Sequence, residues 1–184
     1  KKDFKNENFK NFLVNNFKFI RINSTHGLLT GYYEPIIKVS RTRNNIFKFP
    51  ILKKNKAYDK KARKFIEENF NHKDVILWTN DDIDLFFLHI QGSGIGEFQN
   101  KKKIKIAYSG SNYLNYTSIG RVLLREKKIS TENVNLFSIK DWLRKNPAQR
   151  KQILNTNERF IFFKELDNDI NTQPIGSLGV QLTP

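Results

Sequence analysis

The 184-residue sequence contains neither cysteine nor methionine. Without cysteine the chain has no disulfides, no zinc-thiolate sites and no thiol nucleophile. No apolar run approaches the roughly 20 residues that span a bilayer. Residues 1–20 mix Lys, Asn and Phe, without the apolar core of a signal peptide. Because Met is absent even at position 1, we expect the chain to be part of a longer polypeptide.

Histidine is scarce as well, with only His26, His72 and His89 in the whole sequence. None of them is spaced three or four residues from another ligand type in the pattern of a metal site. We therefore predict no metal and no other cofactor, and we expect each histidine to be at the surface or half-buried.

Acidic residues are outnumbered, since 33 Lys and Arg face 18 Asp and Glu and give a net charge of +15. Such an excess indicates an anionic partner or surface. Nucleic acid, acidic lipid and the carboxylate-bearing peptides of peptidoglycan all remain open on this evidence. Codon bias in an A+T-rich genome also accounts for many Lys and Asn residues.

Helical and strand patterns alternate along the chain without an internal repeat, which predicts an α+β fold class. Helical spacing marks residues 1–22, 58–70 and three segments after Thr117, with Phe65 and Phe137 among the core-facing positions. Strand patterns mark residues 28–36, a hairpin of 95–99 with 103–109, and 160–163. The apolar run 85–90 fits either a helix or a buried strand.

The glycine-rich segment 92–97 resembles a nucleotide loop only superficially. Glu97 occupies the third glycine position of a dinucleotide loop, and no Gly-Lys-Ser/Thr follows as in a P-loop. Gln91 replaces the first glycine of a nucleophile elbow. The segment therefore reads as a tight turn, and Gln91 and Ser93 are candidate donors to sugar hydroxyls.

Two further motifs combine aromatic rings with polar groups. Tyr33 and Glu34 precede a proline, and Tyr108 begins a turn of small polar residues. Thr117 or Ser118 is placed to cap a helix whose free N–H groups suit an anion or a hydroxyl. Rings beside carboxylates suit saccharides, but each motif taken alone also fits a purely structural role.

Taken together and in order, the motifs resemble the membrane-bound lytic murein transglycosylase A family over about residues 28–184. The segments that carry the resemblance are Gly31-Tyr32-Tyr33-Glu34-Pro35, Phe86-Phe87-Leu88-His89-Ile90-Gln91-Gly92-Ser93-Gly94, Tyr108-Ser109-Gly110, Tyr116-Thr117-Ser118-Ile119-Gly120-Arg121, Trp142-Leu143, Asn146-Pro147, Phe162-Phe163-Lys164-Glu165 and Gly176-Ser177-Leu178-Gly179-Val180-Gln181-Leu182-Thr183-Pro184.

The resemblance implies a β-rich two-domain architecture, in which a double-psi β-barrel carries an inserted β-rich domain with helices. By this analogy residues 1–35 form the N-terminal part of the barrel domain. Residues 36–170 form the inserted glycan-cleft domain, and residues 171–184 return towards the barrel. The glycan lies in the groove between the two domains.

The implied reaction is non-hydrolytic cleavage of the β-1,4 bond between N-acetylmuramic acid and N-acetylglucosamine, giving a 1,6-anhydromuramic product. One carboxyl then suffices as acid and base, because a hydroxyl of the substrate itself is the nucleophile. The resemblance implies an Asp beside two glycines beyond Pro184, so we assign no catalytic residue within the chain. We expect the 184 residues alone to be inactive.

The substrate-binding residues implied by the resemblance are Tyr33, Glu34, Gln91, Ser93, Tyr108 and Ser118. Peptidoglycan glycan strands are the expected partner, other cell-wall enzymes are further candidates, and nucleic acid is not expected. The expected location is the periplasm, associated with the outer membrane through a lipid anchor outside this chain. Two alternatives remain open: a non-catalytic peptidoglycan-binding module and a basic nucleic-acid-binding domain.

Overall fold

The computed structural model describes residues 33–166 and four positions near the N-terminus, 11, 12, 14 and 15, which are helical. The chain divides into two compact units, residues 1–31 and 32–184. Most of the helix predicted over 1–22, and nearly all of the segments predicted to join a barrel, lie outside the described residues. Of the strand predicted over 28–36, residues 33–35 are irregular, so the prediction is wrong there, whereas Ile36 is the first residue of a strand.

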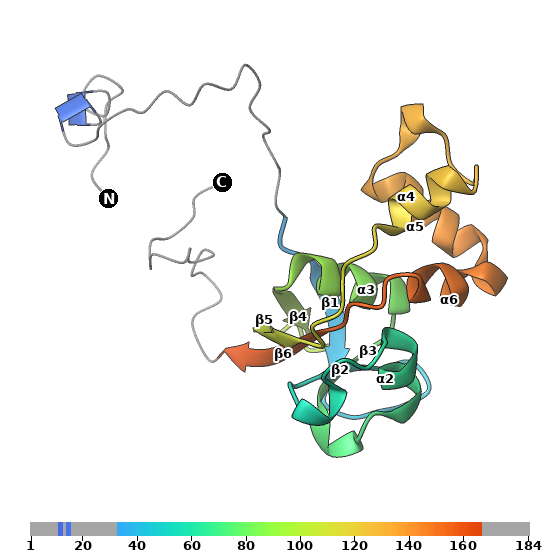
Figure 1. Cartoon of the computed structure of the whole chain (residues 1–184). Coiled ribbons are helices and arrows are strands. Elements are labelled where there is room, and N and C mark those ends of the chain that lie inside the picture. Colours follow the sequence, from blue (N-terminus) through green and yellow to red (C-terminus); the bar gives the residue numbers. More distant parts are fainter. Residues whose placement is uncertain (1–10, 13, 16–32, 167–184) are drawn as a thin grey trace. The chain divides into compact units, whose positions relative to one another are not determined.

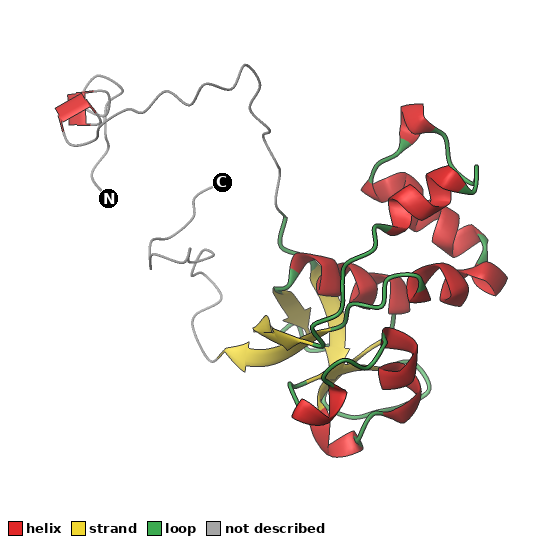
Figure 2. Ribbon diagram, viewed as in Figure 1, coloured by secondary structure: helices red, strands yellow, loops and turns green. Residues whose placement is uncertain are grey.

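The second unit is built on a six-stranded sheet with the strand order β2-β3-β1-β4-β5-β6 (Figure 2). The only parallel pair in this sheet is β1 with β4; the other neighbours run antiparallel. Pro50 lies in edge strand β2, where a residue without an N–H interrupts no ladder. The strand bounds are β1 Ile36–Ser40, β2 Phe49–Leu52, β3 Val75–Thr79, β4 Gly94–Glu97, β5 Lys103–Ser111 and β6 Ile161–Leu166.

The sheet curls, since its two outermost strands share one apolar cluster. Leu52 of β2 and Phe162 of β6 pack together with Ile66 and Phe160. Tyr58 completes the cluster, with its ring stacked on Phe162 at a centroid distance of 5.5 Å. The curl brings the segment before β6 close to the residues that connect β2 and β3.

The helices form two groups around the sheet (Figure 1). Short helices connect β2 to β3, and α4 to α6 extend together on the other side of α3. The bounds are η1 Lys56–Tyr58, α2 Arg63–Asn69, η2 His72–Asp74, α3 Asp82–Gln91, α4 Ile119–Arg125, η3 Thr131–Asn133, α5 Leu136–Lys145 and α6 Pro147–Asn155.

Helix α3 is the central element, and it settles the question left open for residues 85–90 in favour of a helix. The Asp81 carboxylate caps its start by accepting from the N–H groups of Ile83 and Asp84 at 2.8 and 3.0 Å. Gly92 ends it in a left-handed conformation, with φ of 78°. Apolar side chains extend from both sides of α3: Phe87 packs against the helices α4 to α6, and Leu88 packs against the sheet. This two-sided burial explains why the run has no polar face.

The helical group follows the sequence prediction in most respects. Ser118 caps α4, whose residues Ile119, Val122 and Leu123 are buried, and Pro147 is the first residue of α6. Phe137 was predicted to face the core, but its side chain is 79% exposed. Phe65 of α2 is exposed as well, because Ile66 and Arg63 occupy the buried face of that helix.

The α+β prediction is confirmed, and so are the hairpin of β4 with β5 and the final strand β6. Strand β3 was not predicted, and α2 is shorter than the helix expected over 58–70. Among the described residues no helix is long and apolar enough to cross a membrane.

Candidate glycan-binding hollow

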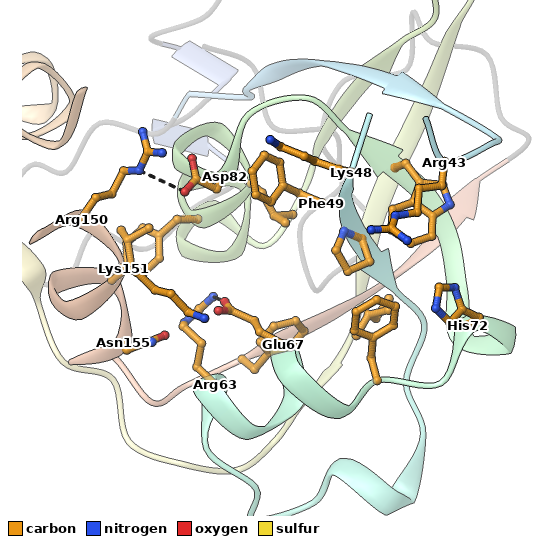
Figure 3. A pocket seen from close by; sticks show the side chains of 18 of the residues that line it. Arg43, Lys48, Phe49, Arg63, Glu67, His72, Asp82, Arg150, Lys151 and Asn155 are labelled. Atoms are coloured by element: carbon orange, nitrogen blue, oxygen red, sulfur yellow. Dashed lines mark hydrogen bonds and ion pairs between the residues drawn. The ribbon is translucent and has the colours of Figure 1, made fainter. Parts of the chain in front are cut away.

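Two hollows lie on different parts of α3. The larger one, of about 560 Å³, is bounded by α2, α6, β2, β3 and the first half of α3 (Figure 3). None of the six residues proposed from the sequence lines it. The smaller one, of about 360 Å³, lies at the C-terminal end of α3. Its lining residues are His89, Ile90, Gly92, Tyr108, Tyr116, Asn157, Arg159 and Ile161.

Two tyrosines give the smaller hollow its aromatic surface. Tyr108 lies on β5, next to a register shift between Tyr108 and Gly110, and its side chain is 51% exposed. Tyr116 lies in the connection from β5 to α4 and is 53% exposed. Exposed rings beside a hollow suit the apolar face of a sugar. Tyr116 begins the motif Tyr116–Arg121 of the family resemblance, but it was not predicted as a site residue.

The two principal sequence motifs pack directly against each other at the edge of this hollow. The N–H of Ile95 donates to the carbonyl of Pro35 at 2.8 Å. A Cβ at Gly94 would lie 2.7 Å from that carbonyl oxygen and 2.6 Å from Leu88 Cδ1. Gly94 therefore has no room for any side chain. The Tyr33–Pro35 segment and the turn after Gln91 are thus in direct contact.

Glu34 and Tyr33 leave this segment in different directions. The carboxylate of Glu34 lies 3.8 Å from the ammonium of Lys105 on β5. Tyr33 lies beside the ion pair of Lys140 with Asp84 in the first half of α3, where burial raises its pKa and the charges of Lys140 and Asp84 act in opposite directions. Seven residues of helix, roughly 10 Å, separate Asp84 from Gln91. Tyr33 is not among the lining residues of the smaller hollow.

The remaining predicted residues flank the smaller hollow without lining it. Gln91 and Ser93 stand on either side of Gly92, a lining residue. The hydroxyl of Ser118 accepts from the N–H of Arg121 at 3.4 Å, which caps α4. Of the six residues, only Tyr108 lines the hollow itself.

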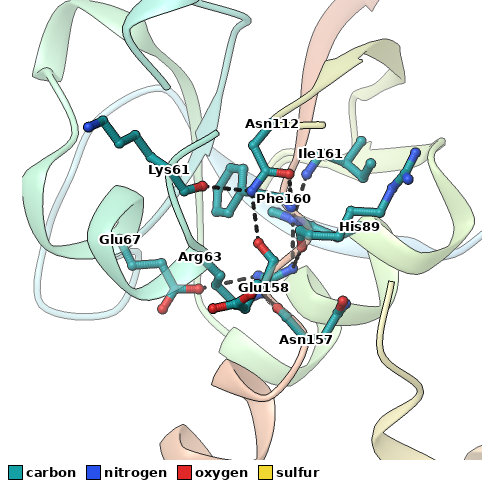
Figure 4. Close-up of polar contacts among 10 residues, drawn as sticks. Lys61, Arg63, Glu67, His89, Asn112, Asn157, Glu158, Phe160 and Ile161 are labelled. Carbon is teal, nitrogen blue, oxygen red and sulfur yellow. Dashed lines mark hydrogen bonds and ion pairs between the residues drawn. The ribbon is translucent and has the colours of Figure 1, made fainter. Parts of the chain in front are cut away.

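A buried polar network shapes one wall of the hollow (Figure 4). The side-chain N–H groups of Asn112 donate to the carbonyls of Lys61 and Glu158, and its oxygen accepts from the N–H of Phe160. Asn157 in turn accepts from the N–H of Thr117 at 3.1 Å. These bonds hold the irregular segment 157–160 in place without regular secondary structure.

His89 is only 4% exposed, so the prediction that it is at the surface or half-buried is wrong. Its Nδ1 accepts from Arg63 Nη2 at 3.3 Å and from the N–H of Ile161 at 3.4 Å. Burial, and then the charge of Arg63, holds the pKa of His89 well below its usual value. His89 is therefore neutral, and its proton is on Nε2, which has no hydrogen-bond partner among the described residues.

The hollow offers donors and rings but no carboxyl group. Its described lining contains aromatic, amide, guanidinium and imidazole groups. Such a surface binds hydroxyls and acetamido groups by hydrogen bonds and stacking, and it supplies no acid for protonating a glycosidic oxygen. His89 belongs to the motif Phe86–Gly94 that carries the family resemblance. No sequence motif marks Asn157 or Arg159, because only the curl of the sheet brings them to the hollow.

Residues 52–164 match the family described as the MltA specific insert domain. A membrane-bound lytic murein transglycosylase A homolog of Buchnera aphidicola is 35% identical over 144 residues, covering 74% of this chain and 39% of that relative. The membrane-bound lytic murein transglycosylase A of Vibrio cholerae is 31% identical over 163 residues, covering 85% and 43%. The chain thus spans about two fifths of the length of these relatives.

Solved structures show the same fold. E. coli MltA with bound chitohexaose superposes with a TM-score of 0.75 at 28% identity, covering 83% of this chain and 46% of that one. The lytic transglycosylase LtgG of Burkholderia pseudomallei gives a TM-score of 0.72 at 33% identity, covering 86% and 49%.

Proposed function

The chain belongs to the membrane-bound lytic murein transglycosylase A family, and we propose that it forms the part of such an enzyme that holds the glycan strand. The substrate is peptidoglycan, and the bond to be cleaved is the β-1,4 linkage between N-acetylmuramic acid and N-acetylglucosamine. The product is a 1,6-anhydromuramic sugar. The division into residues 1–35, 36–170 and 171–184 stays a prediction, and the family match at 52–164 lies within its middle segment.

One observation carries the proposal: Tyr108 and Tyr116 flank a hollow at the turn after Gln91, beside the Tyr33–Pro35 segment. The rings would stack on sugar faces, and Gln91 and Ser93 would donate to hydroxyls at the rim. The related E. coli structure with bound chitohexaose supports an oligosaccharide as the ligand. Glu34 is paired with Lys105, and Ser118 caps α4. Both residues would lie at the entrance to the hollow rather than inside it.

The chemical step needs a proton donor from outside the described lining of the hollow, because that lining holds no carboxyl group. A single carboxyl group would protonate the leaving oxygen and then accept the proton of the attacking hydroxyl. We propose that the 184-residue chain binds glycan without cleaving it. The names of the relatives include the words membrane-bound, which supports a location at a membrane that faces murein. The proposed cellular location is the periplasmic side of the outer membrane.

Tyr108→Ala tests the glycan site directly. Loss of a stacking ring should weaken chitohexaose binding by roughly tenfold, because one aromatic contact contributes about 1 kcal/mol beyond the area it buries. Gln91→Ala should weaken binding as well, while leaving the fold intact. Isothermal titration calorimetry with chitohexaose measures the affinity, and circular dichroism checks the fold.

Tyr113→Ala is the matched control. Tyr113 is also an exposed tyrosine after β5, but it does not line the hollow and packs instead against Lys54. Its loss should leave the affinity unchanged. Equal weakening by Tyr108→Ala and Tyr113→Ala would contradict the proposed site. Release of anhydro-sugars from murein by the purified chain would contradict the proposed absence of an acid.

A further inference from the structure

Segment 157–161 separates the larger hollow from the smaller one, the proposed glycan hollow. Segment 157–161 alternates between the two: Asn157 and Arg159 line the smaller hollow, whereas Phe160 lines the larger one. Arg63 lines the larger hollow and donates across this wall to His89. The two hollows are therefore distinct sites that share one partition.

The unpaired charge of the larger hollow is positive. The guanidinium of Arg43 lies 5.7 Å from the ring centroid of Trp78, and the ammonium of Lys48 lies 5.6 Å from that of Phe49. Within the described part of the chain neither cation has an ion-pair partner. Figure 3 shows both side chains on the same side of the hollow. An anionic group would find two uncommitted cations above an aromatic floor.

The two carboxylates of the hollow are already engaged. Glu67 pairs with Arg63 at 3.3 Å, and Asp82 pairs with Arg150 at 3.1 Å. Burial raises the pKa of both carboxyls, and the paired cations act against that increase. The Glu67 side chain is still 36% exposed, so it can accept from a ligand donor. The hollow thus presents two cations without an ion-pair partner among the described residues at Arg43 and Lys48, and carboxylates paired with Arg63 and Arg150 at its other side.

A further acceptor lies at the acidic side. Asn155 lines the hollow, and its buried side-chain oxygen has no hydrogen-bond partner among the described residues. An unmet buried acceptor favours a ligand that brings N–H groups. A peptide with free carboxylates supplies both N–H donors and negative charge, whereas inorganic phosphate has no N–H groups. The volume of about 560 Å³ lies within the range of small-ligand sites.

We propose that the larger hollow is a second binding site, which takes an acidic peptide with its carboxylates against Arg43 and Lys48 and its N–H groups towards Glu67 and Asn155. The identity of the peptide rests on the proposed function. Peptidoglycan carries short peptides with free carboxylates, so the stem peptide of murein is the expected source. The enzyme would then contact both the sugar and the peptide part of its substrate.

Tryptophan fluorescence tests the proposal by comparing two proteins that both carry Trp142→Phe, one with and one without Arg43 and Lys48. Trp142→Phe leaves Trp78, which lines the larger hollow, as the only tryptophan of the chain. In this background we expect the free murein tetrapeptide to change the Trp78 emission on binding. Arg43→Ala with Lys48→Ala should weaken that binding by at least about tenfold, because two charge-assisted contacts are lost. Chitohexaose binding, measured by calorimetry, should change by less than about twofold.

The matched control is Lys102→Ala with Arg125→Ala. Both side chains are exposed, neither lines the two hollows, and their removal changes the net charge by the same amount. This control should leave tetrapeptide binding unchanged, and so should Tyr108→Ala. A tetrapeptide with its carboxyl groups amidated should bind at least tenfold more weakly than the free tetrapeptide.

Three outcomes would overturn the second site: equal tetrapeptide affinity with and without Arg43 and Lys48, equal affinity of the amidated peptide, or inorganic phosphate that binds as tightly as the peptide. Failure of the glycan proposal is separable, because it would appear as absent chitohexaose binding while tetrapeptide binding and its dependence on Arg43 and Lys48 persist.

Discussion

His89 connects two segments that are distant in the sequence, helix α3 and the wall formed by residues 157–161. Its imidazole lies edge-on to Phe160, at a centroid distance of 4.3 Å, and accepts from Arg63. Arg63 also donates to the carbonyls of Asn157 and Arg159. A buried cation and a neutral imidazole therefore hold the partition between the two hollows, and both must keep their protonation states for the wall to persist.

At the residue scale we predict a pH-dependent stability that depends on His89. The pKa of His89 is depressed in the folded state, so below about pH 6.5 the unfolded chain binds a proton that the folded chain does not. The free energy of unfolding should fall as the pH decreases from 6.5 towards the lowered pKa, with a slope of up to about 1.4 kcal/mol per pH unit. Urea denaturation across pH 5–8 measures it.

His89→Gln removes this titration and is the reference. Glu67 and Asp82 titrate nearby in the opposite sense, because their raised pKa values make the folded state gain stability as the pH falls through them. They are present in both proteins, so the difference between the two profiles isolates His89. Identical pH profiles for the two proteins would contradict a buried, neutral His89.

At the scale of elements, α3 determines where both hollows form. Its first half contributes Asp82 and Phe86 to the larger hollow, and its last residues reach the smaller one. The turn after α3 depends on two glycines for different reasons. Gly92 has a left-handed backbone with nothing near the missing Cβ, whereas Gly94 is in close contact with Pro35 and Leu88.

Gly94→Ala should lower the free energy of unfolding by about 1–3 kcal/mol, because the added methyl group overlaps the Pro35 backbone and Leu88. Gly92→Asn should cost less, since asparagine tolerates the left-handed conformation and meets no neighbour there. Urea denaturation of the two variants compares these costs. If Gly94→Ala were as stable as the parent, residues 33–35 would not pack against this turn as described.

At the scale of the whole molecule, the charge of +15 favours any polyanion, so charge alone does not identify the ligand. The ligand proposed for the glycan hollow, by contrast, is an uncharged sugar held by rings and hydrogen-bond donors. Chitohexaose affinity should therefore change by less than about threefold between 50 and 500 mM salt, because uncharged contacts release no counterions.

A nucleic-acid-binding domain predicts the opposite behaviour. Its affinity for an oligonucleotide would fall steeply over the same range, with a slope set by the number of phosphates neutralised. Titrations of both ligands at several salt concentrations distinguish the two functions. Tight oligonucleotide binding that weakens steeply with salt, without any chitohexaose binding, would rule out the proposed glycan site.

Local chemistry allowed much of this protein to be predicted. Caps such as Ser118, the Pro147 start of α6 and the alternation in β5 act within a few residues, so the sequence alone determined the α+β class, the hairpin and the helical group. The ordered motifs likewise determined the family. The sequence did not determine whether residues 85–90 form a helix or a strand, because both sides of α3 are buried and the segment has no polar face that would reveal a helical period.

Only the tertiary structure decided which residues share a hollow. Asn157, Arg159 and Tyr116 meet His89 because the sheet curls and a buried asparagine network holds the segment before β6. The same packing buries His89. Contacts between residues tens of positions apart leave no periodic trace in a sequence, since their energy comes from long-range burial and hydrogen bonds rather than local propensity.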